Sequence, residues 1–288
     1  MPELAYLNGK VLAIQDAFVP IEDRGYQFGD AVYEVIPSYN GKMFKDKEHI
    51  KRMVYSLKQL RFPEVSEEYL YNELNLFFNK AKLKRASVYM QVSRGVYKRK
   101  HSLPDMENTS VQFVMTIRDI TKEDVATAKK KKKGISVITV KDSRWGRCDI
   151  KTVQLLANSL AKQTALDAGV EDAVFISEDG IVREASSANM FIVKNGIIFT
   201  HPETFNILSG VTRSEIINII KEKKLTLNED FYTAEKLINA EEAFLTGSIT
   251  EVMPVIFANG NRIGTGEPGK ITKDIYASLC KRMTAPIE

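Results

Sequence analysis

The sequence predicts an α+β fold in which antiparallel hairpins are mixed with separate helices. Four Asn-Gly dipeptides, beginning at Asn8, Asn40, Asn195 and Asn259, lie between short apolar stretches. Both residues of Asn-Gly tolerate positive φ, which the type I′ turn of a tight hairpin requires. The Asp-Gly pair at Asp179 is a fifth hairpin candidate. Because the hairpins do not alternate regularly with helices, the pattern favours α+β over a doubly wound parallel sheet.

Two stretches have the apolar spacing of an amphipathic helix, in which every third or fourth residue faces the core. The apolar positions of the first stretch are Ile50, Met53, Val54, Leu57 and Leu60. Those of the second are Ile216, Ile217 and Ile220.

The length of 288 residues exceeds a typical single core and predicts two domains. A polar stretch that starts at Asp119 leads into a lysine run at 129–133. This run can be a phosphate-binding patch or a solvated connector, and the absence of interleaved aromatic residues favours the connector. We therefore expect an N-terminal domain at 1–118, a linker at 119–133 and a C-terminal domain at 134–288.

Composition describes an ordinary globular protein, with 44% hydrophobic and 27% charged residues. The net charge of +4 is too small to call for a nucleic acid or a membrane as partner. Cys148 and Cys280 have no ligand-like spacing, so we expect no disulfide framework and no metal site. Without a leader-like start or a membrane-spanning apolar run, the expected location is the cytoplasm.

One segment carries a candidate for covalent chemistry. In RWGRCDIKT, Lys151 follows Arg144 and Arg147, and an amine near fixed cations loses its proton more readily when it is partly desolvated. The neutral amine is the form that attacks a carbonyl. Glu184 follows 33 positions downstream in VREASSAN. A lysine and a carboxylate for a pyridinium nitrogen are the two parts that a pyridoxal phosphate enzyme requires, although each alone also fits an exposed residue.

The order RWGRCDIK, then EASSAN, resembles the fold-type IV pyridoxal phosphate enzymes, which include branched-chain and D-amino acid aminotransferases and aminodeoxychorismate lyase. The sequence is most similar to the D-amino acid aminotransferases. That similarity runs through YLNG at 6–9, EDRGYQFGDAVYEV at 22–35, RGVYKRKHSLP at 94–104 and FLTGSITEVMPV at 244–255. The resemblance implies two α/β domains with pyridoxal 5′-phosphate in the cleft between them, and a homodimer.

The resemblance also implies roles for individual residues. Lys151 would form the Schiff base with the cofactor and move a proton between Cα of the substrate and C4′, and Glu184 would hold the pyridine nitrogen. The expected phosphate contacts are Arg52, Val211, Thr212 and Ser248, and the residues expected to line the ring are Ser187 and Leu208. The helix expected after Gly210 supports the phosphate assignment, since its free N–H groups and positive dipole end suit an anion.

Three residues are expected to select the substrate by its α-carboxylate, namely Tyr33, Arg99 and His101. The resemblance implies that Arg99 and His101 come from the neighbouring subunit. A planar guanidinium matches a carboxylate in a fork, and anchoring it decides which Cα hydrogen faces Lys151. The same residues also fit an exposed basic loop. Three other residues receive no functional role, because His49 and His201 are expected to be structural or exposed, and Arg183 to face away from Glu184.

The predicted function is the transamination of D-amino acids such as D-alanine, D-glutamate and D-aspartate with 2-oxo acids by a ping-pong mechanism. An alternative with the same fold is a branched-chain L-amino acid aminotransferase or an aminodeoxychorismate lyase. Arg99 and His101 favour the D-amino acid aminotransferase over this alternative. A more distant alternative is a non-catalytic basic protein that binds an acidic partner through the lysine run and the 97–101 loop. It predicts no bound chromophore and salt-sensitive binding.

Overall fold

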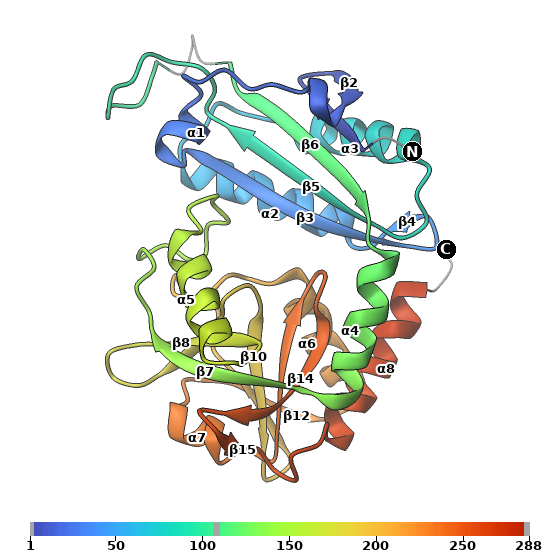
Figure 1. Ribbon diagram of the computed structural model, residues 1–288, viewed down its shortest axis with the longest axis vertical. Coiled ribbons are helices and arrows are strands. Elements are labelled where there is room, and N and C mark those ends of the chain that lie inside the picture. Colours follow the sequence, from blue (N-terminus) through green and yellow to red (C-terminus); the bar gives the residue numbers. More distant parts are fainter. Residues whose placement is uncertain (1–2, 106–109, 285–288) are drawn as a thin grey trace. The chain divides into compact units, whose positions relative to one another are not determined.

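The computed structural model describes residues 3–105 and 110–284 (Figure 1). The chain forms two compact units, one of Met1–Thr121 with Ile150–Gln154 and the other of Lys122–Asp149 with Leu155–Glu288. Each unit combines a sheet with separate helices, which confirms the predicted α+β class. Residues 150–154 lie in the range expected for the C-terminal domain, but they pack with the first unit.

The first unit is built on a six-stranded antiparallel sheet in the order β2-β1-β6-β5-β3-β4. Its strands are β1 (Leu4–Leu7), β2 (Lys10–Ala13), β3 (Ala31–Tyr39), β4 (Lys42–Met43), β5 (Ala86–Ser93) and β6 (Gln112–Asp119). Its helices are η1 (Ile14–Asp16), α1 (Arg24–Phe28), α2 (Asp46–Gln59) and α3 (Glu67–Ala81).

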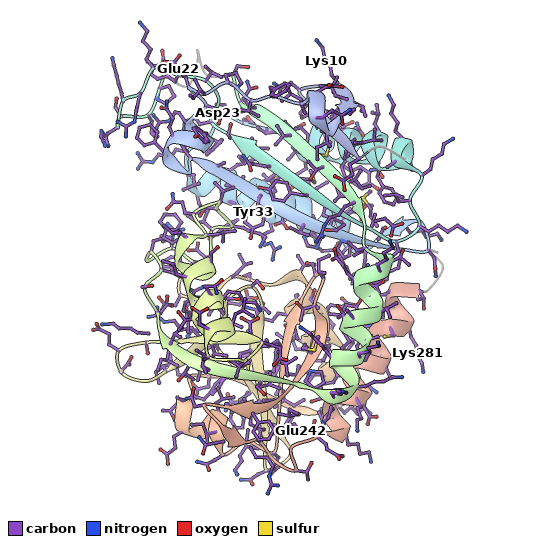
Figure 2. All side chains as sticks on the ribbon, in the orientation of Figure 1. Lys10, Glu22, Asp23, Tyr33, Glu242 and Lys281 are labelled. Atoms are coloured by element: carbon purple, nitrogen blue, oxygen red, sulfur yellow. The ribbon has the colours of Figure 1, made fainter. Side chains whose placement is uncertain are left out.

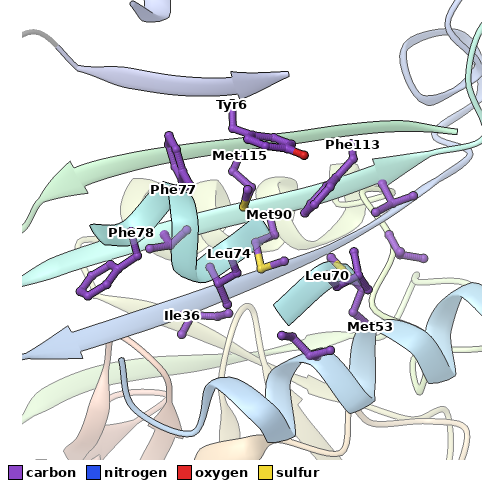
Figure 3. Close-up of a cluster of buried hydrophobic side chains, with 14 of the residues drawn as sticks. Tyr6, Ile36, Met53, Leu70, Leu74, Phe77, Phe78, Met90, Phe113 and Met115 are labelled. Carbon is purple, nitrogen blue, oxygen red and sulfur yellow. The ribbon is translucent and has the colours of Figure 1, made fainter. Parts of the chain in front are cut away.

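Helices α2 and α3 bury their apolar faces in the core of this unit. Ile50, Met53 and Leu57 are buried on α2, as the sequence spacing predicts. Acidic residues in the first turn of α2 and Lys58 in its last turn complement the helix dipole. Figure 3 shows the α3 side chains packed with Tyr6, Met90 and Met115 of the sheet; these belong to one buried cluster that includes Leu70, Leu74 and Phe77.

The second unit has a mixed sheet in the order β12-β11-β10-β13-β14-β7-β8-β9, with β15 beside β14. Because β9 also pairs with β10, the strands from β10 round to β9 close into a barrel. The strands are β7 (Ile135–Lys141), β8 (Asp172–Ile176), β9 (Val182–Ala185), β10 (Asn189–Lys194), β11 (Ile197–Thr200), β12 (Thr226–Glu229), β13 (Glu242–Gly247), β14 (Glu251–Ala258) and β15 (Asn261–Arg262). The helices are α4 (Thr121–Lys133), α5 (Leu156–Asp167), α6 (Val211–Glu222), α7 (Ala234–Ile238) and α8 (Lys270–Thr284).

All four Asn-Gly hairpins predicted from the sequence are present. Asn8, Asn40, Asn195 and Asn259 have φ of 46°, 51°, 52° and 50°, and the following glycines also have positive φ. They join β1–β2, β3–β4, β10–β11 and β14–β15 in antiparallel pairs. The Asp-Gly pair at Asp179 lies between the antiparallel strands β8 and β9, so this hairpin is confirmed as well.

The lysine run lies at the end of helix α4, which starts at Thr121 and belongs to the second unit from Lys122 onward. One lysine of the run is not on the solvated face, because the Lys131 side chain is only 8% exposed. Its Nζ is paired with the carboxylate of Glu251 and donates to the Tyr276 hydroxyl at 3.3 Å. The run is therefore not a uniform basic surface. Among the described residues, no helix is long and apolar enough to cross a membrane.

Candidate active site

Lys151 is held against strand β3 by backbone hydrogen bonds. The Tyr33 N–H donates to the Lys151 carbonyl at 3.0 Å, and the Val153 N–H donates to the Ala31 carbonyl at 3.2 Å. The Lys151 N–H donates to the Ser56 hydroxyl of α2 at 3.1 Å. This irregular segment is thus fixed as an added edge of the first unit, and the direction of the Lys151 side chain is fixed with it.

The structure brings the amine of Lys151 next to the phenol of Tyr33. Nζ lies 3.3 Å from the Tyr33 hydroxyl and 4.3 Å from the centre of its ring. Figure 2 shows Tyr33 on strand β3. The Tyr33 ring stacks on Tyr89 with 5.6 Å between centroids, and burial together with Tyr33 raises the pKa of Tyr89. Two of the predicted site residues therefore form one amine–hydroxyl pair, which can hold and exchange a proton.

Arg52 is bound to a buried carboxylate that the sequence did not single out. Its Nε and Nη2 donate to the two oxygens of Glu34 at 2.7 and 2.8 Å. His49 Nδ1 lies 2.7 Å from the same carboxylate, so this histidine is a buried structural partner. Burial alone would raise the pKa of Glu34, but Arg52 and His49 outweigh it and hold that pKa well below its ordinary value. The guanidinium of Arg52 is consequently fixed in direction on α2.

Arg99 and His101 meet on one aromatic ring. Both side chains are exposed, in the loop after β5. The guanidinium carbon of Arg99 lies 4.9 Å from the centre of the Phe28 ring, and the His101 ring lies 5.7 Å from it, edge to face. The loop therefore packs the two predicted carboxylate ligands against the same aromatic ring.

Glu184 is the centre of the candidate site in the second unit. It is 5% exposed on β9, and one oxygen accepts from the Asn189 side chain at 3.0 Å and from the Leu208 N–H at 3.1 Å. The other oxygen is paired with the Arg144 guanidinium. A buried carboxylate with three donors is stabilised as the anion and fixed in position.

Arg144 connects Glu184 to a second carboxylate. Its Nε and Nη2 donate to Asp142 at 3.0 and 2.8 Å, and Arg183 Nη1 donates to Asp142 at 2.8 Å. The pairing of Arg183 with Asp142 shows where its side chain ends, and the expectation that it faces away from Glu184 stays a prediction. Arg147 is paired with Asp149 at 2.8 Å. Neither arginine is therefore the bare cation that the sequence argument for Lys151 assumed.

The remaining predicted residues lie on the turns around Glu184. Asn189 bridges Glu184 and the Leu208 carbonyl, to which it donates at 2.9 Å. Gly210 packs so closely that a Cβ would meet the Asn189 side-chain oxygen at 2.0 Å. Gly210 caps α6 without a side-chain hydrogen bond, so Val211 and Thr212 begin that helix with its N–H groups uncapped by a side chain.

Ser187 and Ser248 follow strands β9 and β13. Ser187 is exposed in the turn between β9 and β10, and Ser248 is half-buried after the end of β13. Gly247 places the two turns together, because a Cβ there would lie 3.5 Å from the Ser187 carbonyl. The structure thus gathers the second-unit residues around one end of the barrel.

Sequence reasoning missed two residues that hold these groups, Glu34 and Asn189, and it considered Arg144 only as a neighbour of Lys151 and not as the partner of Glu184. The hairpin register was the available signal for Asn189, since it lies directly opposite Glu184 across β9 and β10. The role of Glu34 and the pairing of Arg144 with Glu184 become recognisable only through partners 18 and 40 positions away in the sequence.

The first unit thus carries a lysine amine beside a phenol, and the second carries a fixed buried carboxylate and a helix start without a side-chain cap. The class IV aminotransferase family model matches residues 31–256, and the chain belongs to this family. It is 38% identical over 273 residues to a D-alanine aminotransferase of Bacillus licheniformis, covering 94% of each chain. It is 34% identical over 278 residues to a D-alanine aminotransferase of Staphylococcus haemolyticus, covering 96% of each.

Solved structures share the fold along the whole chain. A branched-chain amino acid aminotransferase of Escherichia coli superimposes with a TM-score of 0.87 at 25% identity, covering 100% of this chain and 96% of that one. A hypothetical aminotransferase of Mycobacterium tuberculosis in its PLP-bound form gives a TM-score of 0.86 at 17% identity, covering 98% and 99%. The second likeness shows the fold alone.

Proposed function

We propose that this protein transfers amino groups from D-amino acids to 2-oxo acids with pyridoxal 5′-phosphate as cofactor. The similarity to two D-alanine aminotransferases over nearly the whole chain supports the substrate class. Each unit contributes one observation that carries the proposal: a lysine amine against a phenol in the first, and a buried carboxylate held by three donors in the second.

Two further features of the second unit fit such a cofactor. The Thr246 hydroxyl is buried and has no hydrogen-bond partner among the described residues. Thr246 lies opposite Asn189 across β10 and β13, so both point to one face of the sheet. The start of α6 after Gly210 adds N–H groups suited to a phosphate.

Pyridoxal phosphate, when bound, draws electron density away from Cα of the amino acid and so makes its hydrogen removable. In our proposal the Lys151 amine would hold the cofactor, and once the amino acid has displaced it, the free amine would take up and return the Cα proton of the substrate. The Tyr33 hydroxyl, 3.3 Å from the Lys151 amine, stabilises that amine in both protonation states. Glu184 keeps a proton on the ring nitrogen, a role that its fixed anionic carboxylate suits.

The other contacts of the cofactor are proposed as follows. Arg52, Val211, Thr212 and Ser248 bind the phosphate, and Ser187 and Leu208 line the ring. The uncapped start of α6 supports the roles of Val211 and Thr212. Glu34 supports the role of Arg52 by holding its guanidinium in one direction.

We propose that Tyr33, Arg99 and His101 bind the substrate α-carboxylate and thereby select D-amino acids. The placement of Arg99 and His101 on one ring supports a joint role, since a fork of donors fixes the orientation of a carboxylate. Orientation of the carboxylate decides which face of Cα is presented to Lys151.

We also propose that two copies of the chain associate and that the enzyme works in the cytoplasm. Three large apolar side chains near α1 support association: Phe18, Ile21 and Tyr26 are 77%, 76% and 77% exposed. Apolar surface of this kind marks a contact with another molecule. The resemblance of the sequence to a homodimeric family favours a second copy as that molecule.

The function is tested by the absorbance spectrum of the protein with pyridoxal phosphate, recorded before and after D-alanine or L-valine. We expect a visible band of the lysine-bound cofactor that decays with D-alanine and persists with L-valine. The variant Lys151→Ala should lack both the band and turnover. Decay with L-valine alone would overturn the D-amino acid assignment, and the absence of any visible band would overturn the role of Lys151.

A further inference from the structure

We propose that Arg24 is a positioning residue for the substrate carboxylate, because it fixes the main chain of the loop that carries Arg99 and His101. The inference rests on the proposed function, in which those two residues bind that carboxylate. Arg24 itself acts through the loop.

Arg24 reaches the loop from the first turn of α1. Its side chain is buried, and Nη1 donates to the Lys100 carbonyl at 2.7 Å and approaches the Ser102 carbonyl at 3.5 Å. These two carbonyls flank His101 on either side. A guanidinium that holds both of them restricts the backbone rotation that would redirect the His101 and Arg99 side chains.

The backbone around Arg24 is joined to the beginning of the same loop. The Arg24 N–H donates to the Gly95 carbonyl at 2.9 Å, and the Tyr97 N–H donates to the Glu22 carbonyl at 3.3 Å. Figure 2 shows Glu22 and Asp23 beside α1. The Arg24 backbone therefore holds the loop at Gly95, where it starts, and the Arg24 side chain holds it on both sides of His101.

Arg24 is itself held by a carboxylate that it shares with a second arginine. Arg24 Nε and Arg94 Nε both donate to the same oxygen of Asp30, each at 2.8 Å. Arg94 also donates to the Leu60 and Arg61 carbonyls at 2.7 and 2.8 Å, and so connects Asp30 to the end of α2. Arg24 is thus fixed to the core of the unit, and the position of the loop follows from it.

The Phe28 ring links Arg24 to the two loop residues directly. The guanidinium carbon of Arg24 lies 4.5 Å from the ring centre, in addition to the contacts of Arg99 and His101 with the same ring. Loss of Arg24 therefore removes both the support of the loop backbone and one side of the packing around Phe28. Because no bond of Arg24 reaches the reacting atoms in this arrangement, the loss should weaken substrate binding and spare the chemical step.

The test compares Arg24→Met with wild-type enzyme in steady-state kinetics with D-alanine. Methionine keeps an unbranched apolar chain but removes all donors. We expect KM for D-alanine to rise about 10- to 100-fold, the effect of losing hydrogen bonds to a charged group, with kcat changed less than about threefold. Arg24→Lys keeps the charge and concentrates the donors on one nitrogen, so it should raise KM less than Arg24→Met does.

Arg85→Met is the matched control. Arg85 donates to the Ser38 carbonyl at 3.1 Å and lies 4.1 Å from the Tyr39 ring centre, so it makes the same kinds of contact elsewhere in this unit. The KM of the Arg85→Met variant for D-alanine should equal that of the wild-type enzyme. If Arg24→Met does not fold, Phe28→Leu and Arg24→Lys provide the test, and each should raise KM.

Arg99→Ala distinguishes a failure of the proposed carboxylate site from a failure of the positioning role of Arg24. If Arg99→Ala raises KM while the Arg24 and Phe28 variants match the Arg85 control, the positioning role of Arg24 is wrong and the proposed function stands. If Arg99→Ala itself leaves KM unchanged, the proposed carboxylate site is wrong, and the role of Arg24 falls with it. A fall in kcat at constant KM in Arg24→Met would also overturn the positioning role.

Discussion

His49 and Glu34 form a buried pair whose protonation must depend on folding. Burial lowers the pKa of His49, and Arg52 and Lys151 lower it further against the opposing effect of Glu34. The pKa of Glu34 is also lowered, because Arg52 and His49 outweigh its burial. Both groups therefore bind fewer protons in the folded protein than in the unfolded chain. Stability should fall as pH falls, first below about 6.5 for the histidine and then below about 4.3 for the glutamate.

The variant His49→Asn tests this dependence. Asparagine retains an amide that can donate to Glu34 but takes up no proton, so the free energy of unfolding should depend less on pH between about 5 and 7. The slope lost is at most about 1.4 kcal/mol per pH unit, the value for one proton. Urea unfolding at several pH values measures it. An unchanged slope in His49→Asn would contradict the pairing.

At the scale of secondary-structure elements, the sequence predicted the turns and helices that are determined by neighbouring residues. The Asn-Gly hairpins and the apolar faces of α2 and α6 follow from residues within a few positions of one another, and the structure confirms them. The lysine run became part of a helix because lysine is a good helix former even without an apolar face. What could not be predicted depends on long-range pairing, such as Lys151 against β3 or Asn189 next to Leu208.

Helix α4 is connected to α8 and β14 through one buried ion pair. Lys131 and Glu251 are each 8% exposed, and the Tyr276 hydroxyl lies 3.2 Å from Glu251. Glu251 has a φ of 58°, a conformation that favours glycine, and its carboxylate contacts help to hold it there. Removing the charge of Glu251 therefore leaves the Lys131 ammonium buried without its carboxylate.

We therefore expect Glu251→Gln to lower the free energy of unfolding by about 3–5 kcal/mol, the cost of an uncompensated buried charge. The double variant Lys131→Met with Glu251→Gln should lose less than that single variant, because neither charge remains. Chemical unfolding measures both. Lys130→Met, at an exposed neighbouring position, should be close to wild type. The single variant Lys131→Met completes the comparison, and a double variant that loses as much as Lys131→Met and Glu251→Gln together would show that the two residues do not interact.

At the scale of the whole molecule, the proposed dimer assigns Lys151 and Arg99 of one site to different copies of the chain. The contacts of these residues do not show which copy of the chain supplies Arg99 to a given site. Lys151 is held by β3, and Arg99 by the Phe28 ring, within a single chain. The exposed Phe18, Ile21 and Tyr26 support association but leave open which copy each Arg99 serves. Subunit complementation answers that question directly.

Lys151→Ala and Arg99→Ala chains should each be inactive or severely impaired as homodimers. When the two chains are coexpressed and mix at random, half of the dimers contain one of each, and each mixed dimer has one site with both residues intact. The mixture should then recover about a quarter of wild-type activity with D-alanine, provided that Arg99 acts across the symmetric interface. Purification through two different affinity tags isolates the mixed dimers, which should reach about half of wild-type activity by the same symmetry argument. If Arg99 serves its own chain, every site in the mixed dimer lacks one residue, and activity stays at the average of the two parent variants.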